Sequence, residues 1–281
     1  MPMTINTNVA SLNAQRNAAK TDNSLSTSLQ RLSSGLRVNS AKDDAAGLAI
    51  ASRMDAQARG MNVAVRNSND GISLVQTAES GMAVMGDMLQ RMRELAVQAT
   101  NGTNTSTDLV ALNQEYTQLQ GEILRTLSSV QFNGTSLLNA TSAFDFQVGA
   151  NSGQTISIST ANLSVTAGLA SISGVGASAL LGTATNSASL NSGNITAIDA
   201  AISSIDSSRA NLGAIQNRFS YTVTFLQAAS ENQQAARGRI MDADFAVETS
   251  NLSRAQILQQ AGAAMVAQAN QLPQGVLALL R

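Results

Sequence analysis

Apolar residues recur at alternating steps of three and four along both flanks of this chain. Near the N-terminus the stripe consists of Leu25, Leu29, Leu32 and Leu36. A second run extends over residues 72–96, and a third follows one seam over residues 198–226. A repeat of this kind puts apolar groups on a narrow stripe that must pack against another helix. The pattern predicts a mainly α protein built as a long antiparallel helical coiled-coil rod.

The ends of the predicted helices follow from capping residues and from the scarcity of proline. Proline occurs only at Pro2 and Pro273, so helices between them are not interrupted. Acidic and polar residues just before residue 44 predict the start of a helix, and Asn101-Gly predicts its end near Ala99. A second helix is predicted from Ser106 to about Ser129.

The centre of the chain has a different pattern. No Lys, Arg, Asp or Glu occurs from Phe146 to Ile198. Alternating apolar residues predict a small β-hairpin, with one strand from about Ala143 and its partner from about Gln154. Residues 163–165 are predicted to add a short strand. The low-complexity sequence beyond Gly168 predicts loop or small β elements.

Large apolar residues at the two ends form stripes that two helices alone leave largely exposed to water. We predict that these stripes are buried against other copies, which makes the chain filament-forming. A plain intramolecular helical bundle is the alternative. The predicted polymerisation interface consists of Ile5, Val9, Leu12, Leu25, Leu29, Leu32, Leu36, Leu252, Ile257, Leu258, Met265, Leu272, Val276, Leu279 and Leu280.

Composition excludes several classes of function. The 281 residues include no His, Cys or Trp, so thiolate chemistry, disulfides and the commonest general base and metal ligand are absent. We therefore predict no catalytic, cofactor or metal site. The formal net charge of −1 gives no bulk attraction to nucleic acid or anionic membranes. The N-terminal segment lacks the pattern of a secretory signal peptide, and no membrane span is expected.

Several segments resemble bacterial flagellin. They are INTNVASLNAQRN at 5–17, SLQRLSSGLRVNSAKDDAAGLAIASRM at 28–54, FNGTSLL at 132–138, FQVGANSGQTISI at 146–158, NLGAIQNRFSYTV at 211–223 and residues 231–281. The resemblance implies a structural subunit of the motility filament. It also implies export by the flagellar type III apparatus to an extracellular location, and three partners: an export chaperone, a cap protein and hook-junction proteins.

The same resemblance implies how the chain is divided. Residues 1–43 with 240–281 would form a terminal coiled-coil core domain. Residues 44–145 with 195–239 would form a helical rod domain. Residues 146–194 would carry the β-hairpin and a short variable surface region, too short for large outer domains.

A segment at 89–98, LQRMRELAVQ, looks like the part of flagellin that a vertebrate toll-like receptor recognises. By this resemblance the contact residues would be Gln90, Arg91, Glu94, Leu95 and Glu115. The alternative is that they pack between protofilaments. Both interpretations are compatible if the receptor binds only monomers, in which that face is free.

The charged residues near position 40 have two interpretations at the level of sequence. Arg31, Arg37, Lys42, Asp43 and Asp44 form either a solvated loop or a hinge between subunits. The protein as a whole has three: a filament subunit, a hook-filament junction protein of the same superfamily, or a monomeric adhesin or receptor agonist.

Overall fold

The computed structural model describes residues 7–160, 162–163, 169 and 187–278, with backbone alone for 187–192 and 272–278. The chain divides into two compact units: residues 1–57 with 231–281, and residues 58–230. Both divisions lie inside helices rather than between them. The boundaries that the flagellin resemblance implies, at residues 43/44 and 239/240, instead lie near helix ends. That domain assignment remains a prediction.

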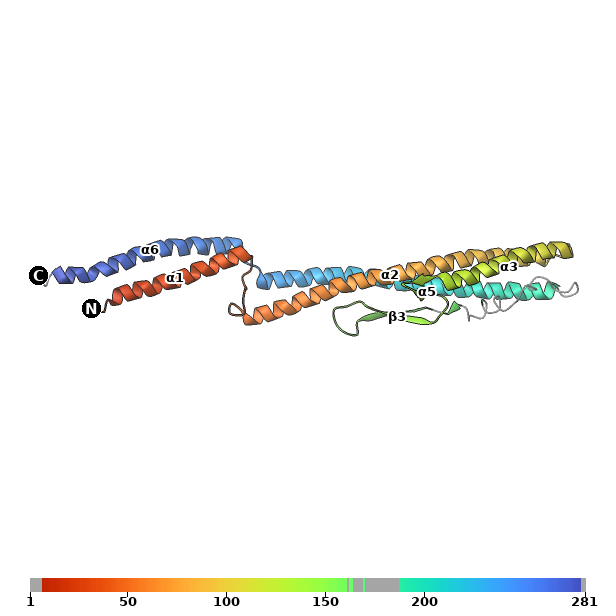
Figure 1. The fold of residues 1–281 in the computed structure, drawn as a ribbon, viewed down its shortest axis with the longest axis horizontal. Coiled ribbons are helices and arrows are strands. Elements are labelled where there is room, and N and C mark those ends of the chain that lie inside the picture. The colour runs from red at the N-terminus through yellow and green to blue at the C-terminus, as the bar shows by residue number, and fades with distance from the viewer. Residues whose placement is uncertain (1–6, 161, 164–168, 170–186, 279–281) are drawn as a thin grey trace. The chain divides into compact units, whose positions relative to one another are not determined.

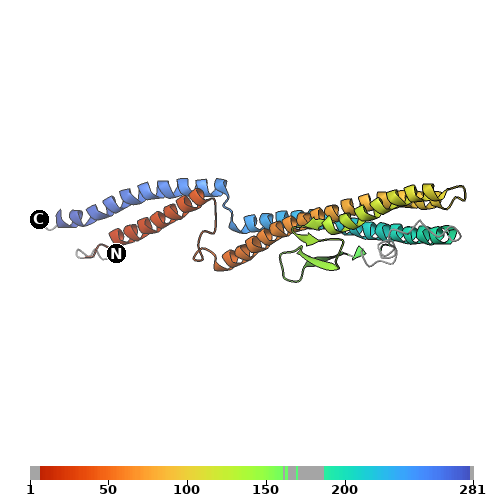
Figure 2. The ribbon, with the colours of Figure 1, turned by 45° about the vertical axis from the view of Figure 1, so that its right-hand side comes forward.

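The first unit pairs the two terminal helices, α1 (Val9–Ser34) and α6 (Phe245–Ala278), which lie side by side and antiparallel (Figures 1 and 2). Asn8 caps α1, because its Oδ1 accepts a hydrogen bond from the Ser11 N–H at 3.1 Å. Gly35 ends the helix at φ 70° and donates its N–H to the Arg31 carbonyl. A positive φ is readily adopted by glycine, so the end of α1 is encoded locally.

The short segment that follows α1 and the short segment that precedes α6 meet beside these helices. Leu36 and Asp242 form an antiparallel bridge, and the Ala243 N–H donates to the Gly35 carbonyl at 2.9 Å. A small apolar cluster of Val38, Ala51 and Met241 lies against this bridge. These contacts tie the end of α1 to the start of α6.

The second unit contains most of α2 (Ala45–Ala99), α3 (Ser106–Ser129) and most of α5 (Ser187–Met241), packed side by side (Figure 1). The helices predicted to end near Ala99 and to span Ser106 to Ser129 are confirmed. Thr105 and Asp108 form a capping box at the start of α3, which satisfies two backbone N–H groups of the first turn.

The predicted apolar seams form the core of this unit. Its fully buried members include Met82, Met85, Leu89 and Met92 of α2, Tyr116 and Ile123 of α3, and Ile198, Ile205 and Phe219 of α5. At Gly71 a Cβ would lie 2.8 Å from the Phe219 ring. Glycine there lets the ring lie directly on the α2 backbone.

Two hairpins follow α3. The first joins β1 (Gln131–Phe132) to β2 (Thr135–Ser136) through Asn133 and Gly134, both at positive φ, as a tight primed turn requires. The second pairs β3 (Ser142–Gln147) with β4 (Thr155–Thr160) and confirms the predicted hairpin.

The alternation of apolar residues decides which face of the second hairpin is covered. Ile156 and Ile158 are buried, while Thr155, Ser157 and Ser159, which alternate with them, are exposed. The Phe146 ring meets the Phe219 ring edge to face, at 5.7 Å between centroids. The hairpin therefore packs on the helices through one face.

Two predictions for the centre differ from the structure. Leu163 is not in a strand, and its N–H donates to the Leu138 carbonyl at 3.0 Å; Val165 lies outside the described residues. Residues 187–194, predicted as loop or small β elements, are the first turns of α5. Ala188 and Leu190 are favourable helix formers, and the absence of charge there does not prevent a helix. Residues 170–186 lie outside the described part.

Candidate assembly interface

Small residues form the seam between α1 and α6. The buried residues of these helices include Ser11 and Ser28 on α1 and Ala255 and Ala269 on α6. A Cβ placed on Gly262 would lie 3.7 Å from the Cβ of Ala18, so the backbones approach closely. Such residues bury little apolar area, so the seam contributes little hydrophobic stabilisation to the isolated pair.

Polar contacts set the register of this seam. The Asn8 side-chain amide donates to the Ala269 carbonyl at 2.7 Å, and the Ser11 hydroxyl lies 2.6 Å from Asn270 Oδ1. Further along, Gln259 donates to Asp22 at 2.9 Å. Because each bond joins one particular pair of side chains, they favour a single alignment of the two helices.

Large apolar side chains of both helices point away from the seam. The exposed fraction is 65% for Val9, 51% for Leu12, 66% for Ile257, 51% for Leu258 and 63% for Met265. Leu29 is exposed as well, whereas Leu25, Leu32 and Leu252 are partly buried. A helical pair that is complete by itself would turn such residues inward. The interface predicted from the stripes is thus available on the surface of a single chain.

Some of the predicted interface residues are not available in this way. Ile5, Leu279 and Leu280 lie outside the described residues, as do the side chains of Leu272 and Val276. Leu36 follows the end of α1 and packs partly buried beside Val38 and Met241. Gly35 ends the helix one residue before it, so Leu36 does not continue the stripe of α1 in the single chain, and its place in the polymerisation interface stays a prediction.

The surface of the pair is hollowed into two adjoining grooves. One, of about 350 Å³, has a floor of small residues including Ala14, Ala18 and Gly262, with Leu258 and Met265 beside them. The other, of about 520 Å³, is polar and includes Lys20 and Arg254. Leu258 lines both grooves.

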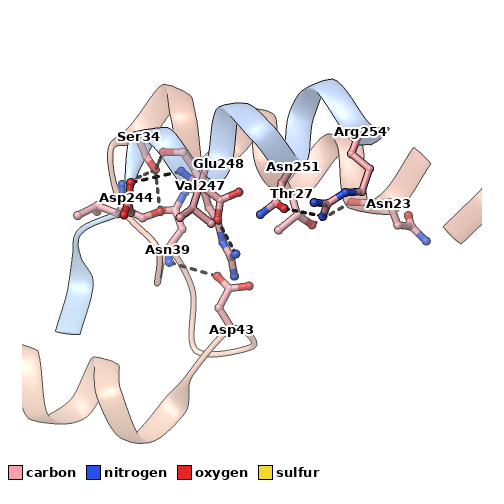
Figure 3. Close-up of polar contacts among 12 residues, drawn as sticks. Asn23, Thr27, Ser34, Asn39, Asp43, Asp244, Val247, Glu248, Asn251 and Arg254 are labelled. Atoms are coloured by element: carbon pink, nitrogen blue, oxygen red, sulfur yellow. Dashed lines mark hydrogen bonds and ion pairs between the residues drawn. The ribbon is translucent and has the colours of Figure 1, made fainter. Parts of the chain in front are cut away.

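An ion pair lies at the end of the seam nearest the connections. The Arg31 guanidinium contacts the Glu248 carboxylate at 3.0 Å, with the Arg31 and Glu248 side chains 30% and 8% exposed. Asp244 starts α6 by accepting the N–H groups of Ala246 and Val247 (Figure 3). This places Glu248 in the first turn of α6, where the helix dipole favours a negative charge.

Replacing Glu248 with Ala should destabilise the terminal helix pair by about 2–4 kcal/mol, because it leaves the partly buried Arg31 guanidinium without its partner. Thermal unfolding of assembled protein, followed by circular dichroism at 222 nm, would measure the loss. The matched control is Glu231→Ala, at an exposed carboxylate on α5, which should change the midpoint very little. Equal midpoints for Glu248→Ala and the wild type would contradict a stabilising role for the pair.

The charged residues near the α1–α2 connection are used within the chain. Asp43 Oδ2 accepts the N–H groups of Ser40 and Asn39, at 2.9 and 3.1 Å (Figure 3). These hydrogen bonds hold the pKa of the Asp43 carboxyl below its ordinary value, and the bond from the Ser40 N–H has the largest effect. Asp44 accepts the Gly47 N–H at 2.8 Å and starts α2, and Arg37 donates to the Ile240 carbonyl at 2.6 Å. The connection is therefore an ordered turn held by intramolecular hydrogen bonds, while the Arg37 and Asp43 side chains remain exposed.

The second candidate surface lies on α2 and α3. Arg91 contacts Glu115 at 2.8 Å and Glu94 at 2.9 Å, and both carboxylates raise the pKa of its guanidinium. These three residues and Gln90 are exposed. Leu95, however, is 1% exposed and belongs to the core of the second unit. Its predicted role as a contact residue is corrected, because its side chain points from α2 into the core.

Exposed aromatic residues on α5 were not singled out by the sequence reasoning. Tyr221 and Phe225 are 78% and 69% exposed. The sequence pattern could have identified them, because both are large aromatic residues that lie off the apolar seam that includes Leu212, Phe219 and Leu226.

No helix among the described residues combines the length and apolarity needed to cross a membrane. Within the same residues, no three acidic side chains gather where a metal ion would bind.

Two family models match the chain. The bacterial flagellin N-terminal helical region matches residues 5–143, and the bacterial flagellin C-terminal helical region matches residues 195–280. Together they include both terminal helices, α2, α3 and all of α5 except residues 187–194, and they leave out most of the β3–β4 hairpin.

Curated relatives match over their whole length. A flagellin of Halalkalibacterium halodurans is 47% identical over 280 residues, covering 99% of this chain and 100% of the relative. A flagellin of Bacillus subtilis is 40% identical over 304 residues, with 99% and 100% covered. A solved structure described as a flagellar hook-associated protein from Vibrio parahaemolyticus is 12% identical, with a TM-score of 0.58, over 71% of this chain and 100% of that chain. At that identity the likeness concerns the fold alone.

Proposed function

Because the chain belongs to the bacterial flagellin family and is a structural subunit of the flagellar filament, we propose that it polymerises through the outward faces of α1 and α6. The observation that carries the proposal is that this helix pair buries its small residues and exposes its large apolar ones. Small residues lie in the seam, and Leu12, Ile257, Leu258 and Met265 face water. Because these side chains are already partly covered, covering the rest of each would contribute about 1–2 kcal/mol before entropic costs.

In this proposal the terminal helices become fully ordered during assembly and are not fully ordered before it. A seam of small and polar residues gives an isolated pair little hydrophobic stabilisation, and most of the stability of a protein helix comes from tertiary packing rather than from helix propensity. We propose that α1 and α6 become fully ordered when neighbouring copies cover them at the growing tip. Contacts between two different faces repeat without limit and build a filament when the rotation between neighbouring copies does not close a ring.

Salt-induced assembly of the purified full-length protein tests this proposal. We expect filaments that sediment and are visible by negative-stain microscopy, with amide hydrogens of α1 and α6 exchanging quickly in the monomer and slowly in the filament. A monomer that never sediments and already protects both helices would contradict it.

Family membership supports a proposal about export and about partners of the chain. We propose secretion through the flagellar type III apparatus, an export chaperone that covers the apolar face of α6 before export, and contacts with a cap protein and hook-junction proteins. An unpartnered face with Ile257, Leu258 and Met265 exposed supports a chaperone, since such a surface favours aggregation inside the cell. The full-length match to flagellins favours a filament subunit over a hook-filament junction protein.

We also propose recognition of the monomer by a vertebrate toll-like receptor through Gln90, Arg91, Glu94 and Glu115, which are all exposed. Arg91→Ala should reduce the receptor response at least tenfold, because its planar guanidinium holds two carboxylates in place and is itself a typical interface anchor. A reporter-cell assay with monomer would measure this. Arg125→Ala, which alters a neighbouring exposed ion pair with Glu122, is the matched control. Absence of a response to wild-type monomer would end the proposal.

A further inference from the structure

Two aromatic rings on α5 lie outside the core formed by the described residues. Tyr221 and Phe225 are 78% and 69% exposed and lie four residues apart, so they occupy adjacent turns of one helix face. The buried seam of α5 contains Phe219, and Tyr221 follows it by two residues, about 200° around the helix. The pair therefore faces away from the core of the second unit.

This exposure is unusual for a chain with so few aromatic residues. The sequence contains six Phe and two Tyr, and Tyr221 and Phe225 exceed every other aromatic side chain in exposed fraction among the described residues. Within the residues that the structure describes, neither ring stacks on another ring. Exposed aromatic residues cost solubility, and they are enriched at the centres of protein interfaces.

A cation adjoins the pair. Arg218 precedes Tyr221 by three residues, is exposed, and forms no ion pair in the described part of the chain. Tyr, Phe and Arg are residue types enriched at interfaces, which indicates a protein partner with an apolar surface and negative charge.

A second copy of the chain offers such a surface on α2 and α3. Val84, Val110 and Leu124 are 52%, 43% and 40% exposed. Between Val84 and Arg125 the sequence has five acidic residues, namely Asp87, Glu94, Asp108, Glu115 and Glu122, against three arginines, a net charge of −2. Exposed apolar residues among excess carboxylates complement an aromatic pair beside an arginine.

We infer that Tyr221, Phe225 and Arg218 of one subunit dock on the α2–α3 face of a second copy in the filament. The inference rests on the proposed polymerisation but concerns a contact separate from the α1–α6 faces. The two faces differ, so the contact is of the repeating, head-to-tail kind that a filament requires.

Nitration of tyrosine gives a direct test, because the chain has only two tyrosines and no tryptophan. Tyr116 is 1% exposed, and burial raises its pKa to about 12, so it should be protected from tetranitromethane at pH 8. In the folded monomer we expect one nitro group, at Tyr221. In assembled filaments we expect nitration at Tyr221 to be at least tenfold slower.

Two variants complete the test. Tyr221→Phe keeps the ring and removes the reactive phenol, so its monomer should take up no nitro group and should assemble like the wild type. The double variant Tyr221→Gln, Phe225→Gln keeps residues that favour helix, so its monomer should retain wild-type circular dichroism. It should assemble only at a critical concentration about tenfold higher or more.

The outcomes separate this inference from the proposed function. Filaments whose Tyr221 is nitrated at the monomer rate, or an unchanged critical concentration for the double variant, would overturn the docking of the aromatic pair and leave polymerisation standing. Failure of the wild type to assemble at all would overturn both.

Discussion

Deleting residues 252–281 should abolish filament growth completely while the second unit stays folded. The deletion removes Ile257, Leu258 and Met265 from the outward face of α6, together with the partners of Asn8, Ser11 and Asp22 on α1. An α1 helix without α6 is marginal in water, so helical signal should fall by more than the deleted residues account for. Light scattering and negative-stain microscopy would measure assembly, and circular dichroism would measure helicity.

The second unit serves as the internal control for this deletion. Its core cluster contains no described residue of α6, so its cooperative thermal transition should be retained. Normal filaments from the truncated chain would contradict the assignment of the interface to the terminal helices. Loss of the transition of the second unit would show instead that the deletion prevents folding.

Leu258→Asp should block assembly without unfolding the monomer. The side chain is 51% exposed in the single chain, so a carboxylate there is solvated before assembly and desolvated afterwards. Burying an unpaired charge costs about 3 kcal/mol or more in each subunit, which raises the critical concentration more than a hundredfold. Sedimentation of assembly mixtures over a range of protein concentrations would measure this.

A second carboxylate on the same helix controls for charge alone. Gln260 is exposed and lines neither groove, so Gln260→Asp changes the net charge equally and should assemble at a concentration much nearer to that of the wild type. Growth of Leu258→Asp filaments at the wild-type concentration would refute the assignment. Equal inhibition by both variants would attribute the effect to net charge rather than to a buried seam.

Features encoded in a few neighbouring residues were predicted well. The end of the helix near Ala99, the whole of α3 and the hairpin of β3 and β4 follow from capping residues and from alternation. The seam from Ile198 to Leu226 was also recognised, because apolar residues at steps of three and four can satisfy each other only across a helix interface. Function followed from the resemblance of long segments to flagellin, and composition alone excluded His- and Cys-dependent chemistry.

The sequence did not resolve local patterns that are compatible with two arrangements in space. Leu36 continues the leucine spacing of α1, but Gly35 ends the helix, and Leu36 packs against a separate apolar cluster. Leu95 lies among exposed contact candidates in the sequence, yet it points into the core because it follows Met92 by three residues on the same face. The first turns of α5 lack charge, a pattern that loops and helices share.

The sequence thus predicted most of the helices, several of their ends and the apolar stripes, and its composition excluded chemistry that depends on His or Cys. The direction of each stripe was decided by the packed chain, because α1 and α6 meet through Ser11, Ala18, Ala255 and Gly262 rather than through leucines. Small side chains let the two backbones approach closely, and polar hydrogen bonds set the register of the helices. The larger apolar side chains therefore remain on the outside of the pair. A periodic pattern states that a stripe needs a partner, but only three-dimensional packing reveals which side chains the chain covers by itself and which remain for another copy.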